Sequence, residues 1–363
     1  MVSMSNENVA WMRDVVGYAC PYEMTEPFAS DPSIITRICN PLSPDDFIYG
    51  GGGSMMQTFY DAMTSLGDVT LLTKTKAEEL IMDGNTVTGV IASRSDGSKL
   101  TVNAKAVILA TGGWDFGGYY RDTFAPGLPV DWRDHNSCNG AEGDGLAMVE
   151  KIGVKVTCDS PANLSAIFFY QAPTPENYIV VDSQGQRVVD ESKNDVIQTG
   201  AMVADPNYPF FRVFDSKDEQ GCLKDAAEED YLKADTIGEL AALMNVDEAQ
   251  LTETIERYNS MKGQTDEDFG KEASRMTGIE EGPFYAVVTN GFTCNGSYGG
   301  PAINDKFEIL TDVDGEVVPG LYGAGEFCNI SVMGYDFPHH GCNLQYCMTS
   351  GRTSAQSAAA YIG

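Results

Sequence analysis

The sequence predicts an α/β fold into which a cap domain of α+β type is inserted. Two short apolar segments, residues 107–110 and 318–322, have the composition of buried strands, and each runs into a glycine turn, at 111–113 and 323–325. Glycine turns after buried strands let the backbone approach a ligand closely. Residues 114–282, which lie between the two segments, are rich in loops, prolines and aromatic residues, and this change indicates the insertion.

Before the insertion, apolar residues at helical spacing predict a helix over 6–17. Residues 48–66 indicate a strand, a run of glycines and a helix with Met55, Phe59 and Met63 on one face. The predicted strands, several of them separated by glycine turns, are residues 69–72, 77–82, 86–93, 99–102 and 107–110.

Within the insertion, residues 143–153 predict a helix with Asp144 near its N-terminus, where a carboxylate is favoured. Residues 179–190 predict a hairpin that carries Arg187. Amphipathic patterns predict helices over 237–244 and 247–258. We expect the chain to return to the first domain at residues 283–286 and to end in a helix over 341–361.

Length and composition narrow the class of protein. With 363 residues, 42% hydrophobic and 21% charged, the chain has the composition of a globular protein of two domains. Its net charge of −30 argues against binding to nucleic-acid phosphates or anionic lipid. No apolar run approaches the roughly 18 residues of a membrane helix, and residues 1–40 lack a signal-peptide pattern. We therefore expect a cytoplasmic location, with export as the alternative if a signal precedes Met1.

The nine cysteines include no Cys-x-x-Cys pair. This pattern favours reduced core residues over a disulfide framework. A zinc site is poorly supported because the chain has only three histidines, His135, His339 and His340.

Six short motifs occur in one order along the chain: Ala110-Thr-Gly-Gly113, Gly143-Asp-Gly145, Gly185-Gln-Arg187, Tyr298-Gly-Gly300, Gly320-Leu-Tyr-Gly-Ala-Gly-Glu326 and Gly351-Arg352. In this order they resemble the flavoprotein family of fumarate reductases, succinate dehydrogenases and 3-ketosteroid dehydrogenases. The resemblance implies a Rossmann-like FAD domain made of residues 1–113 and 283–363, with residues 114–282 as the cap. No Gly-x-Gly-x-x-Gly turn follows a strand near Met1, so we expect an incomplete FAD domain whose N-terminal part is missing.

The resemblance also assigns residues to the cofactor FAD. It places Glu326 on the ribityl chain, where a carboxylate accepts hydrogen bonds from hydroxyl groups, and the backbone of Thr111, Gly112 and Gly113 near the diphosphate. The start of the last helix would face the pyrimidine end of the flavin, because a helix N-terminus offers free N–H groups and a positive dipole end. The other assigned residues are Ala77, near the adenine, and Ser331, Gly341, Cys342, Asn343 and Leu344.

The four glycines at residues 50–53 lie between a predicted strand and a predicted helix. They lack the Gly-Lys-Ser/Thr ending of a phosphate-binding loop. The sequence favours a flexible entry to the helix over a role in holding the cofactor.

Two substrate patterns of the family are altered. The fumarate reductases hold a dicarboxylate with arginines, which suit bidentate binding, yet residues 327–350 contain no Arg or Lys. Lys193 or Asn194 stands where the proton-donating arginine is expected, and Cys138 and Asn295 align with the two substrate histidines. Activity on fumarate or succinate is therefore not expected.

Residues 331–341 resemble the ketosteroid dehydrogenase segment in which a tyrosine hydroxyl and a glycine N–H polarise a ketone. Gly341 matches that glycine, but Phe337 replaces the tyrosine and has no hydroxyl to donate. Tyr335, two residues earlier, is a candidate donor if the loop is shifted.

His339 and His340 precede the helix that would face the flavin. A histidine titrates near operating pH, so either residue is a candidate acid or base for a substrate carbonyl, and His340 is preferred because it adjoins Gly341. The alternative is that both fill a polar loop. Lys193 and Tyr335 complete the catalytic candidates, whereas Arg187 is interpreted as structural and Glu150 as a weaker proton-relay candidate.

The predicted function is a flavin-dependent oxidoreductase that transfers hydride between FAD and a carbon–carbon bond next to a carbonyl, as enone or enoate reduction or the reverse dehydrogenation. We expect a small-molecule substrate, and the candidate partners are an electron-donor protein or a complementary N-terminal chain. The competing interpretation is a non-catalytic truncated fragment, or one half of a split flavoprotein.

Overall fold

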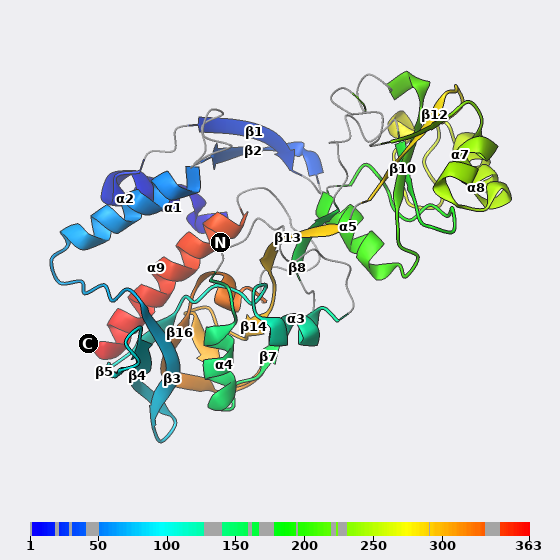
Figure 1. The fold of residues 1–363 in the computed structure, drawn as a ribbon. Helices are drawn as coiled ribbons and strands as arrows, with labels where there is room; N and C mark the ends of the chain where they lie inside the picture. Colours follow the sequence, from blue (N-terminus) through cyan, green and yellow to red (C-terminus); the bar gives the residue numbers. More distant parts are fainter. Residues whose placement is uncertain are drawn as a thin grey trace. The chain divides into compact units, whose positions relative to one another are not determined.

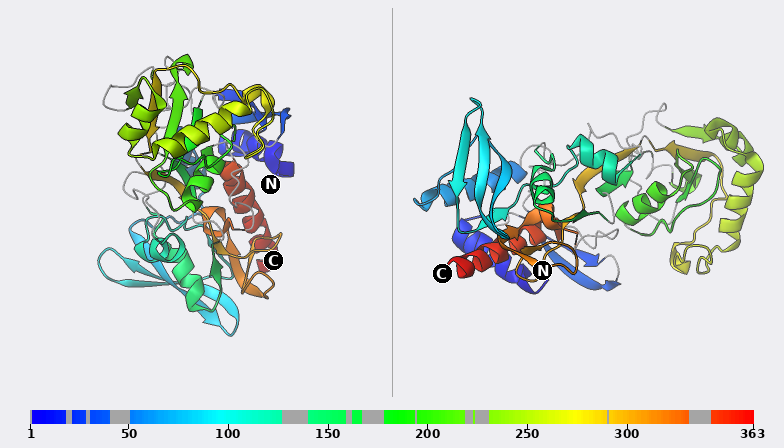
Figure 2. Two further views of the ribbon diagram at one scale, coloured as in Figure 1. Left: turned by 90° about the vertical axis from the view of Figure 1, so that its right-hand side faces the viewer. Right: turned by 90° about the horizontal axis from the view of Figure 1, so that it is seen from below.

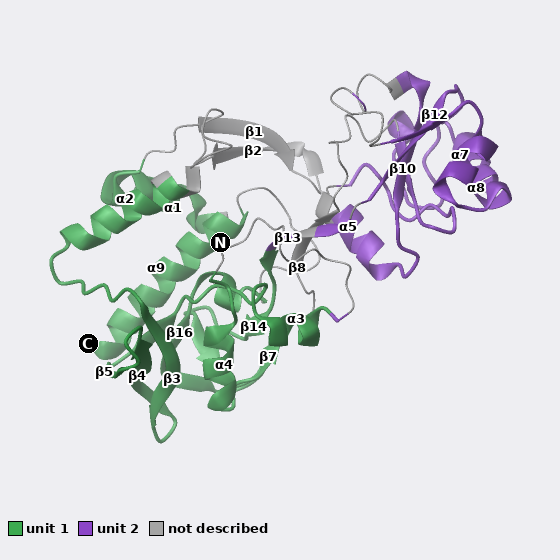
Figure 3. Ribbon diagram, in the orientation of Figure 1, with its two compact units in different colours: residues 1–125, 138–161, 296–363 green, residues 126–137, 162–295 purple. Residues whose placement is uncertain are grey.

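The computed structural model describes residues 2–18, 22–28, 31–40, 51–126, 140–158, 162–166, 178–193, 195–218, 223, 231–289, 291–330 and 342–363. The chain divides into two compact units (Figure 3). Unit 1 comprises Met1–Ala125, Cys138–Pro161 and Gly296–Gly363, and unit 2 comprises Pro126–Ser137 and Ala162–Asn295. Both units contain helices and strands (Figures 1 and 2).

A three-stranded sheet in unit 1 brings together the two predicted strand-and-glycine segments. Its strand order is β15 (Glu308–Leu310), β16 (Val317–Gly323) and β6 (Val107–Leu109). Strands β16 and β6 are parallel, with Leu321 opposite Val107 and Gly323 opposite Leu109. The prediction that these two segments share one domain agrees with this pairing. Val107, Leu109 and Leu321 are buried on the sheet.

The predicted meander is confirmed as an antiparallel sheet of β3 (Thr75–Asp83), β4 (Thr86–Arg94) and β5 (Lys99–Asn103). Its two turns use Gly84 and Gly97, whose φ values of 58° and 82° are in the left-handed region that glycine adopts easily. Strand β4 also packs against β16, so the meander and the three-stranded sheet form one body.

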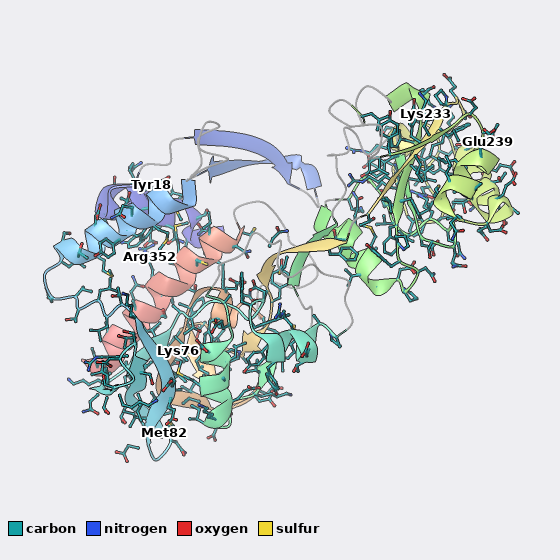
Figure 4. All side chains as sticks on the ribbon, in the orientation of Figure 1. Tyr18, Lys76, Met82, Lys233, Glu239 and Arg352 are labelled. Carbon is teal, nitrogen blue, oxygen red and sulfur yellow. The ribbon has the colours of Figure 1, made fainter. Side chains whose placement is uncertain are left out.

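Helices α1 (Ser5–Trp11) and α9 (Cys342–Ile362) confirm the two predicted terminal helices, and α1 continues as a π-helix over Met12–Val16. Buried Asn8 joins them: its side-chain amide donates to the Thr349 hydroxyl at 2.8 Å and its carbonyl oxygen accepts from Arg352 at 2.5 Å. Arg352 is one of the side chains labelled in Figure 4. Helix α9 also packs against β16 and β6.

Two predictions for unit 1 are corrected. Residues 69–72 are not a strand: Val69, Leu71 and Leu72 are exposed, and the segment pairs with no strand in the part of the chain that the structure describes. A strand needs a partner for its backbone groups, and here pairing begins only at Thr75. Helix α2 (Gly51–Ser65) includes Gly51 to Gly53, so these glycines form its first turn and not a loop before it. The predicted strand at 48–50 lies outside the described residues.

Unit 2 is built on a four-stranded antiparallel sheet in the order β11 (Leu232–Ala234), β12 (Phe284–Val288), β10 (Phe211–Asp215) and β9 (Tyr178–Val181). Helices α7 (Ile237–Met244) and α8 (Glu248–Ser260) confirm the two amphipathic helices. A capping box at Thr236 begins α7, and the Asp247 side chain caps α8. The apolar faces of these two helices form one hydrophobic core with the sheet. Leu240, Leu251 and Ile255 are fully buried in it.

Further helices and strand pairs lie along the chain. Of the hairpin predicted over residues 179–190, the structure forms β9 and a single bridge between Val181 and Arg187. Helix α4 (Asp144–Lys151) confirms the helix predicted after Gly143. The others are α3 (Gly118–Phe124), α5 (Asp195–Ala204), the pair β1 (Tyr22–Phe28) and β2 (Asp31–Asn40), the pair β7 (Val156–Thr157) and β14 (Gly300–Pro301), and the pair β8 (Ala162–Ala166) and β13 (Phe292–Ser297).

The residue bounds of the two compact units differ from those of the predicted domains. Residues 114–125 belong to unit 1, where the Trp114 indole N–H donates to the Tyr298 carbonyl at 2.8 Å. Strand β12 pairs with β10 and β11, so the chain returns to unit 1 at Gly296 and not at residue 283. Which residues form the FAD domain and which the cap stays a prediction.

Among the helices within the described ranges, none combines the length and the apolar character that crossing a membrane requires.

Candidate cofactor-binding site

The ends of two parallel strands bring the predicted cofactor residues together. Strand β6 leads into Thr111, Gly112 and Gly113, and β16 leads into Gly325 and Glu326. The Ala324 N–H donates to the Leu109 carbonyl at 2.9 Å, which holds the two turns side by side. Both turns need glycine, because φ is 73° at Gly112 and 66° at Gly325.

Gly113 lies against the Glu326 carboxylate and the Ser297 hydroxyl. A Cβ atom at Gly113 would lie 1.8 Å from Ser297 Oγ and 2.9 Å from Glu326 Oε1. No larger residue fits without displacing both groups. The close approach brings the backbone of the first turn within reach of anything that Glu326 binds.

We expect Gly113→Ala to destabilise unit 1 by about 1–3 kcal/mol, the usual cost of forcing a methyl group into filled space. Gly118→Ala is a matched control, because a Cβ at that position meets only the end of the Arg121 side chain, at 3.8 Å. Thermal unfolding of the cofactor-free protein checks both variants. Equal melting temperatures for Gly113→Ala and wild type would contradict the packing described here.

Glu326 is half-buried, and only one of its two carboxylate oxygens is engaged. Oε1 accepts the Ser297 N–H at 2.6 Å and lies 3.2 Å from the Ser297 hydroxyl. Among the described residues, none forms a hydrogen bond with Oε2. Burial raises the pKa of Glu326 to about 7, with a contribution from the negative charge of Asp115, while its hydrogen bonds to Ser297 oppose the rise. Oε2 is thus available to a ligand.

A second set of contacts fixes the segment that carries Ser297. The Asn329 amide donates to the Ser297 carbonyl at 2.9 Å and its oxygen accepts the Gly299 N–H at 3.0 Å. The backbone N–H of Trp114 donates to the Ser297 hydroxyl at 2.8 Å. Sequence reasoning missed Ser297, Asn329 and Asp115, although the neighbouring Tyr298-Gly-Gly300 motif marks the segment.

The predicted adenine-side residue Ala77 lies on β3, next to Lys76, which Figure 4 labels. The Lys76 ammonium pairs with Asp144 at 3.0 Å and Glu142 at 3.2 Å, at the start of α4. The Gly143 N–H in turn donates to the Gly113 carbonyl at 3.0 Å. Strand β3, which carries Ala77, is therefore linked through the start of α4 to the glycine turn.

Two further features belong to this region. The Thr111 hydroxyl is buried and has no hydrogen-bond partner among the described residues, a state that costs about 1–3 kcal/mol unless a ligand satisfies it. A depression of about 700 Å³ lies between α3 and α4, lined by residues that include Tyr119, Tyr120 and Glu150. There the Tyr120 hydroxyl donates to Glu150 at 2.6 Å.

Cys342, Asn343 and Leu344 form the first turn of α9, where backbone N–H groups have no partner within the helix. The Gly325 N–H donates to the Ser350 hydroxyl of α9 at 2.9 Å, so this helix contacts the second glycine turn. The structure thus brings these residues to the same unit as Glu326.

The catalytic candidates are placed less completely. Lys193 lies in unit 2, exposed, with its ammonium 3.6 Å from Asp190. The other catalytic candidates, Tyr335, His339 and His340, lie outside the described residues, as do the predicted cofactor residues Ser331 and Gly341.

The glycine turns allow close backbone approach to a ligand. Within the described residues, Glu326 Oε2 and the Thr111 hydroxyl have no hydrogen-bond partner, so both can bind polar groups of that ligand. This geometry suits a nucleotide cofactor that carries hydroxyl groups, held by an α/β domain. Residues 36–344 match the model of the FAD binding domain family, and the chain belongs to this family. The predicted cofactor, FAD, is confirmed by this match.

Relatives with known activities are similar over part of their length. The chain is 28% identical to the NADH:fumarate oxidoreductase of Klebsiella pneumoniae over 290 residues, which cover 76% of this chain and 30% of that protein. It is 30% identical to the NADH:acrylate oxidoreductase of Vibrio harveyi, over 70% of this chain and 27% of that protein. The chain thus spans less than one third of the length of these two relatives.

Solved structures show the same fold. The 3-ketosteroid Δ1-dehydrogenase of Sterolibacterium denitrificans matches with a TM-score of 0.69 and 23% identity, over 85% of this chain and 63% of that one. A flavocytochrome c3 fumarate reductase matches with a TM-score of 0.62 and 21% identity, over 99% of this chain and 63% of that one. These likenesses confirm the predicted fold class.

Proposed function

We propose that this chain is the FAD-binding part of an oxidoreductase that transfers hydride between the flavin and a carbon–carbon bond next to a carbonyl. The relatives named for acrylate and for fumarate support the reaction class. So does a relative named 4-oxocyclohexanecarboxylate 2-dehydrogenase, from Sinomonas cyclohexanicum, at 30% identity. The absence of Arg and Lys from residues 327–350 argues for an enone or a monocarboxylic enoate over a dicarboxylate.

The free oxygen of Glu326 is the observation that carries this proposal. Beside a glycine turn, Oε2 would accept hydrogen bonds from the ribityl hydroxyls, and the backbone of residues 111–113 lies along the same edge of the sheet. Cys342, Asn343 and Leu344 would place the positive end of the α9 dipole at the pyrimidine end of the ring. Bound FAD supplies the hydride acceptor or donor. A protein acid or base, for which His340, His339, Tyr335 and Lys193 are the candidates, handles the paired proton.

Glu326→Ala should weaken FAD binding about 10- to 100-fold, the range expected for losing hydrogen bonds to a charged group. The measurement is the quenching of flavin fluorescence as cofactor-free protein is titrated into FAD at pH 8. Glu316→Ala is the matched control, because Glu316 is an exposed glutamate of unit 1 just before β16. Unchanged affinity in Glu326→Ala would refute the assignment of this carboxylate.

The substrate class is tested by anaerobic reoxidation. Protein with its flavin reduced is mixed with cyclohex-2-enone, acrylate or fumarate, and flavin absorbance is followed. We expect the enone or the monocarboxylate to reoxidise the flavin faster than fumarate. The reverse order would contradict the substrate class and leave the cofactor assignment standing.

We further propose that an electron-donor protein or a complementary chain works with this one. The support is that the relatives named as NADH oxidoreductases are more than three times the length of the matched region. Co-purification with tagged chain, followed by NADH-dependent reduction of the flavin, tests the proposal. NADH reduction by the chain alone would refute the need for a donor.

A further inference from the structure

Ser297 contacts two carboxyl groups with one side chain. The residue is buried, with 1% of its surface exposed. Its hydroxyl oxygen lies 3.2 Å from Glu326 Oε1 and 3.1 Å from Asp115 Oδ1, and it accepts the Trp114 N–H at 2.8 Å. Its own N–H donates to Glu326 Oε1 at 2.6 Å.

A serine hydroxyl has a single proton to donate. It can therefore satisfy Glu326 or Asp115 at one moment, but not both. When both carboxyl groups are ionised, one of them loses the hydroxyl donor, and two negative charges face each other across one hydroxyl. When Glu326 holds a proton, the conflict is removed.

We propose that Ser297 is a positioning residue of the FAD site, which holds Glu326 Oε1 so that Oε2 faces the cofactor and links the protonation of Glu326 to the negative charge of Asp115. The proposal rests on the proposed function for its link to FAD. The coupling of the two carboxyl groups stands on the hydrogen bonds of the cofactor-free chain.

The groups around Glu326 decide whether its pKa rises or falls. In the part of the chain that the structure describes, the titratable groups facing it are Asp115, from the segment after β6, and Cys347, from α9. The pKa of the Cys347 thiol is raised, by partial burial of the sulfur and by the charge of Glu326, so this thiol stays protonated near neutral pH. The charge of Asp115 raises the pKa of Glu326, and the Ser297 hydrogen bonds lower it.

Two substitutions should therefore move the titration of Glu326 in opposite directions. Ser297→Ala removes the hydroxyl donor, so the pKa of Glu326 should rise above its wild-type value of about 7. Asp115→Asn removes a neighbouring negative charge, so the pKa of Glu326 should fall. The readout is the carboxyl ¹³C resonance of Glu326 in cofactor-free, ¹³C-glutamate-labelled protein between pH 5 and 9, assigned by its loss in Glu326→Gln.

The same variants are then titrated with FAD at pH 8, followed by flavin fluorescence. Ser297→Ala should bind FAD about 10-fold more weakly, because its Glu326 loses one hydrogen bond and is partly protonated at that pH. Asp115→Asn should bind at least as tightly as wild type.

Equal Glu326 midpoints in Ser297→Ala and wild type would overturn the proposal. Should Ser297→Ala fail to fold, Asp115→Asn alone decides, since an unchanged midpoint there also overturns it. If the midpoints move as expected while FAD binds equally to all variants, the positioning role is wrong and the coupling stands. If wild type itself binds no FAD, the proposed function fails, and the titration still decides the coupling.

Discussion

Arg187→Ala should lower the free energy of unfolding of unit 2 by about 3–5 kcal/mol, the usual cost of removing one partner from a buried ion pair. The Arg187 guanidinium makes two hydrogen bonds to Glu191, at 2.8 and 2.6 Å, and a third to Asp266 at 2.6 Å. Only 6% of its side chain is exposed, and both carboxylates are fully buried. Its removal would leave Asp266 buried without a cation.

Lys271 cannot replace the lost charge. It is fully buried, with its ammonium 3.2 Å from Glu191 and 3.2 Å from the Tyr258 hydroxyl. Burial lowers the pKa of Lys271, although Glu191 opposes the shift. Arg187 also lies over the Tyr258 and Phe269 rings, 4.9 and 5.0 Å from their centres, so its loss removes packing as well as charge.

Hydrogen–deuterium exchange of peptides from β9, β10 and β12 measures this effect, because it reports the opening of unit 2 separately from unit 1. Arg257→Ala is the matched control: the same residue type pairs with two carboxylates, Glu267 and Asp268, but at the surface. Exchange in the control should match wild type, since exposed ion pairs contribute little. Arg187→Lys should be intermediate, because an ammonium cannot make the two-pronged contact. Wild-type exchange in Arg187→Ala would show that the network is not needed for stability.

Much of the fold could be predicted because its signals are local. Helices α7 and α8 follow from apolar spacing and from caps within three residues of their start. The meander follows from alternating strands and glycine turns. The pairing of β6 with β16 is long-range, and it was accessible only because both segments carry the same strand-and-glycine signal and a family resemblance orders them.

The parts that sequence reasoning missed depend on contacts distant in the chain. Ser297 reaches Trp114 and Asp115, about 182 residues earlier, and no spacing rule connects a serine to a carboxylate at that range. Arg187 was predicted to be structural, yet its partner Asp266 is 79 residues away. The apolar run at 69–72 predicts a strand that the structure does not form, because composition alone does not reveal whether a partner strand exists.

His340 is the residue on which we expect turnover to depend most. It lies two residues before Cys342, the first residue of α9, and this helix contacts the turn that carries Glu326. No Arg or Lys occurs in residues 327–350, so no guanidinium or ammonium group there can stabilise charge on a substrate carbonyl. Phe337 has no hydroxyl to donate. A histidine, with an unperturbed pKa of about 6.5, is suited to supply or take the proton near neutral pH.

His340→Ala should therefore lower kcat by about 10²-fold or more, the usual contribution of a general acid or base, and should leave FAD content near that of wild type. The measurement is turnover of the best substrate from the reoxidation panel, together with flavin absorbance per protein chain. Tyr335→Phe is the matched test of the competing donor, and we expect it to keep most of the activity. Normal turnover in His340→Ala with loss in Tyr335→Phe would assign the proton to the tyrosine. Loss of FAD in His340→Ala would instead give the histidine a role in cofactor binding, because an acid or base that serves only the substrate has no effect on how tightly the flavin is held.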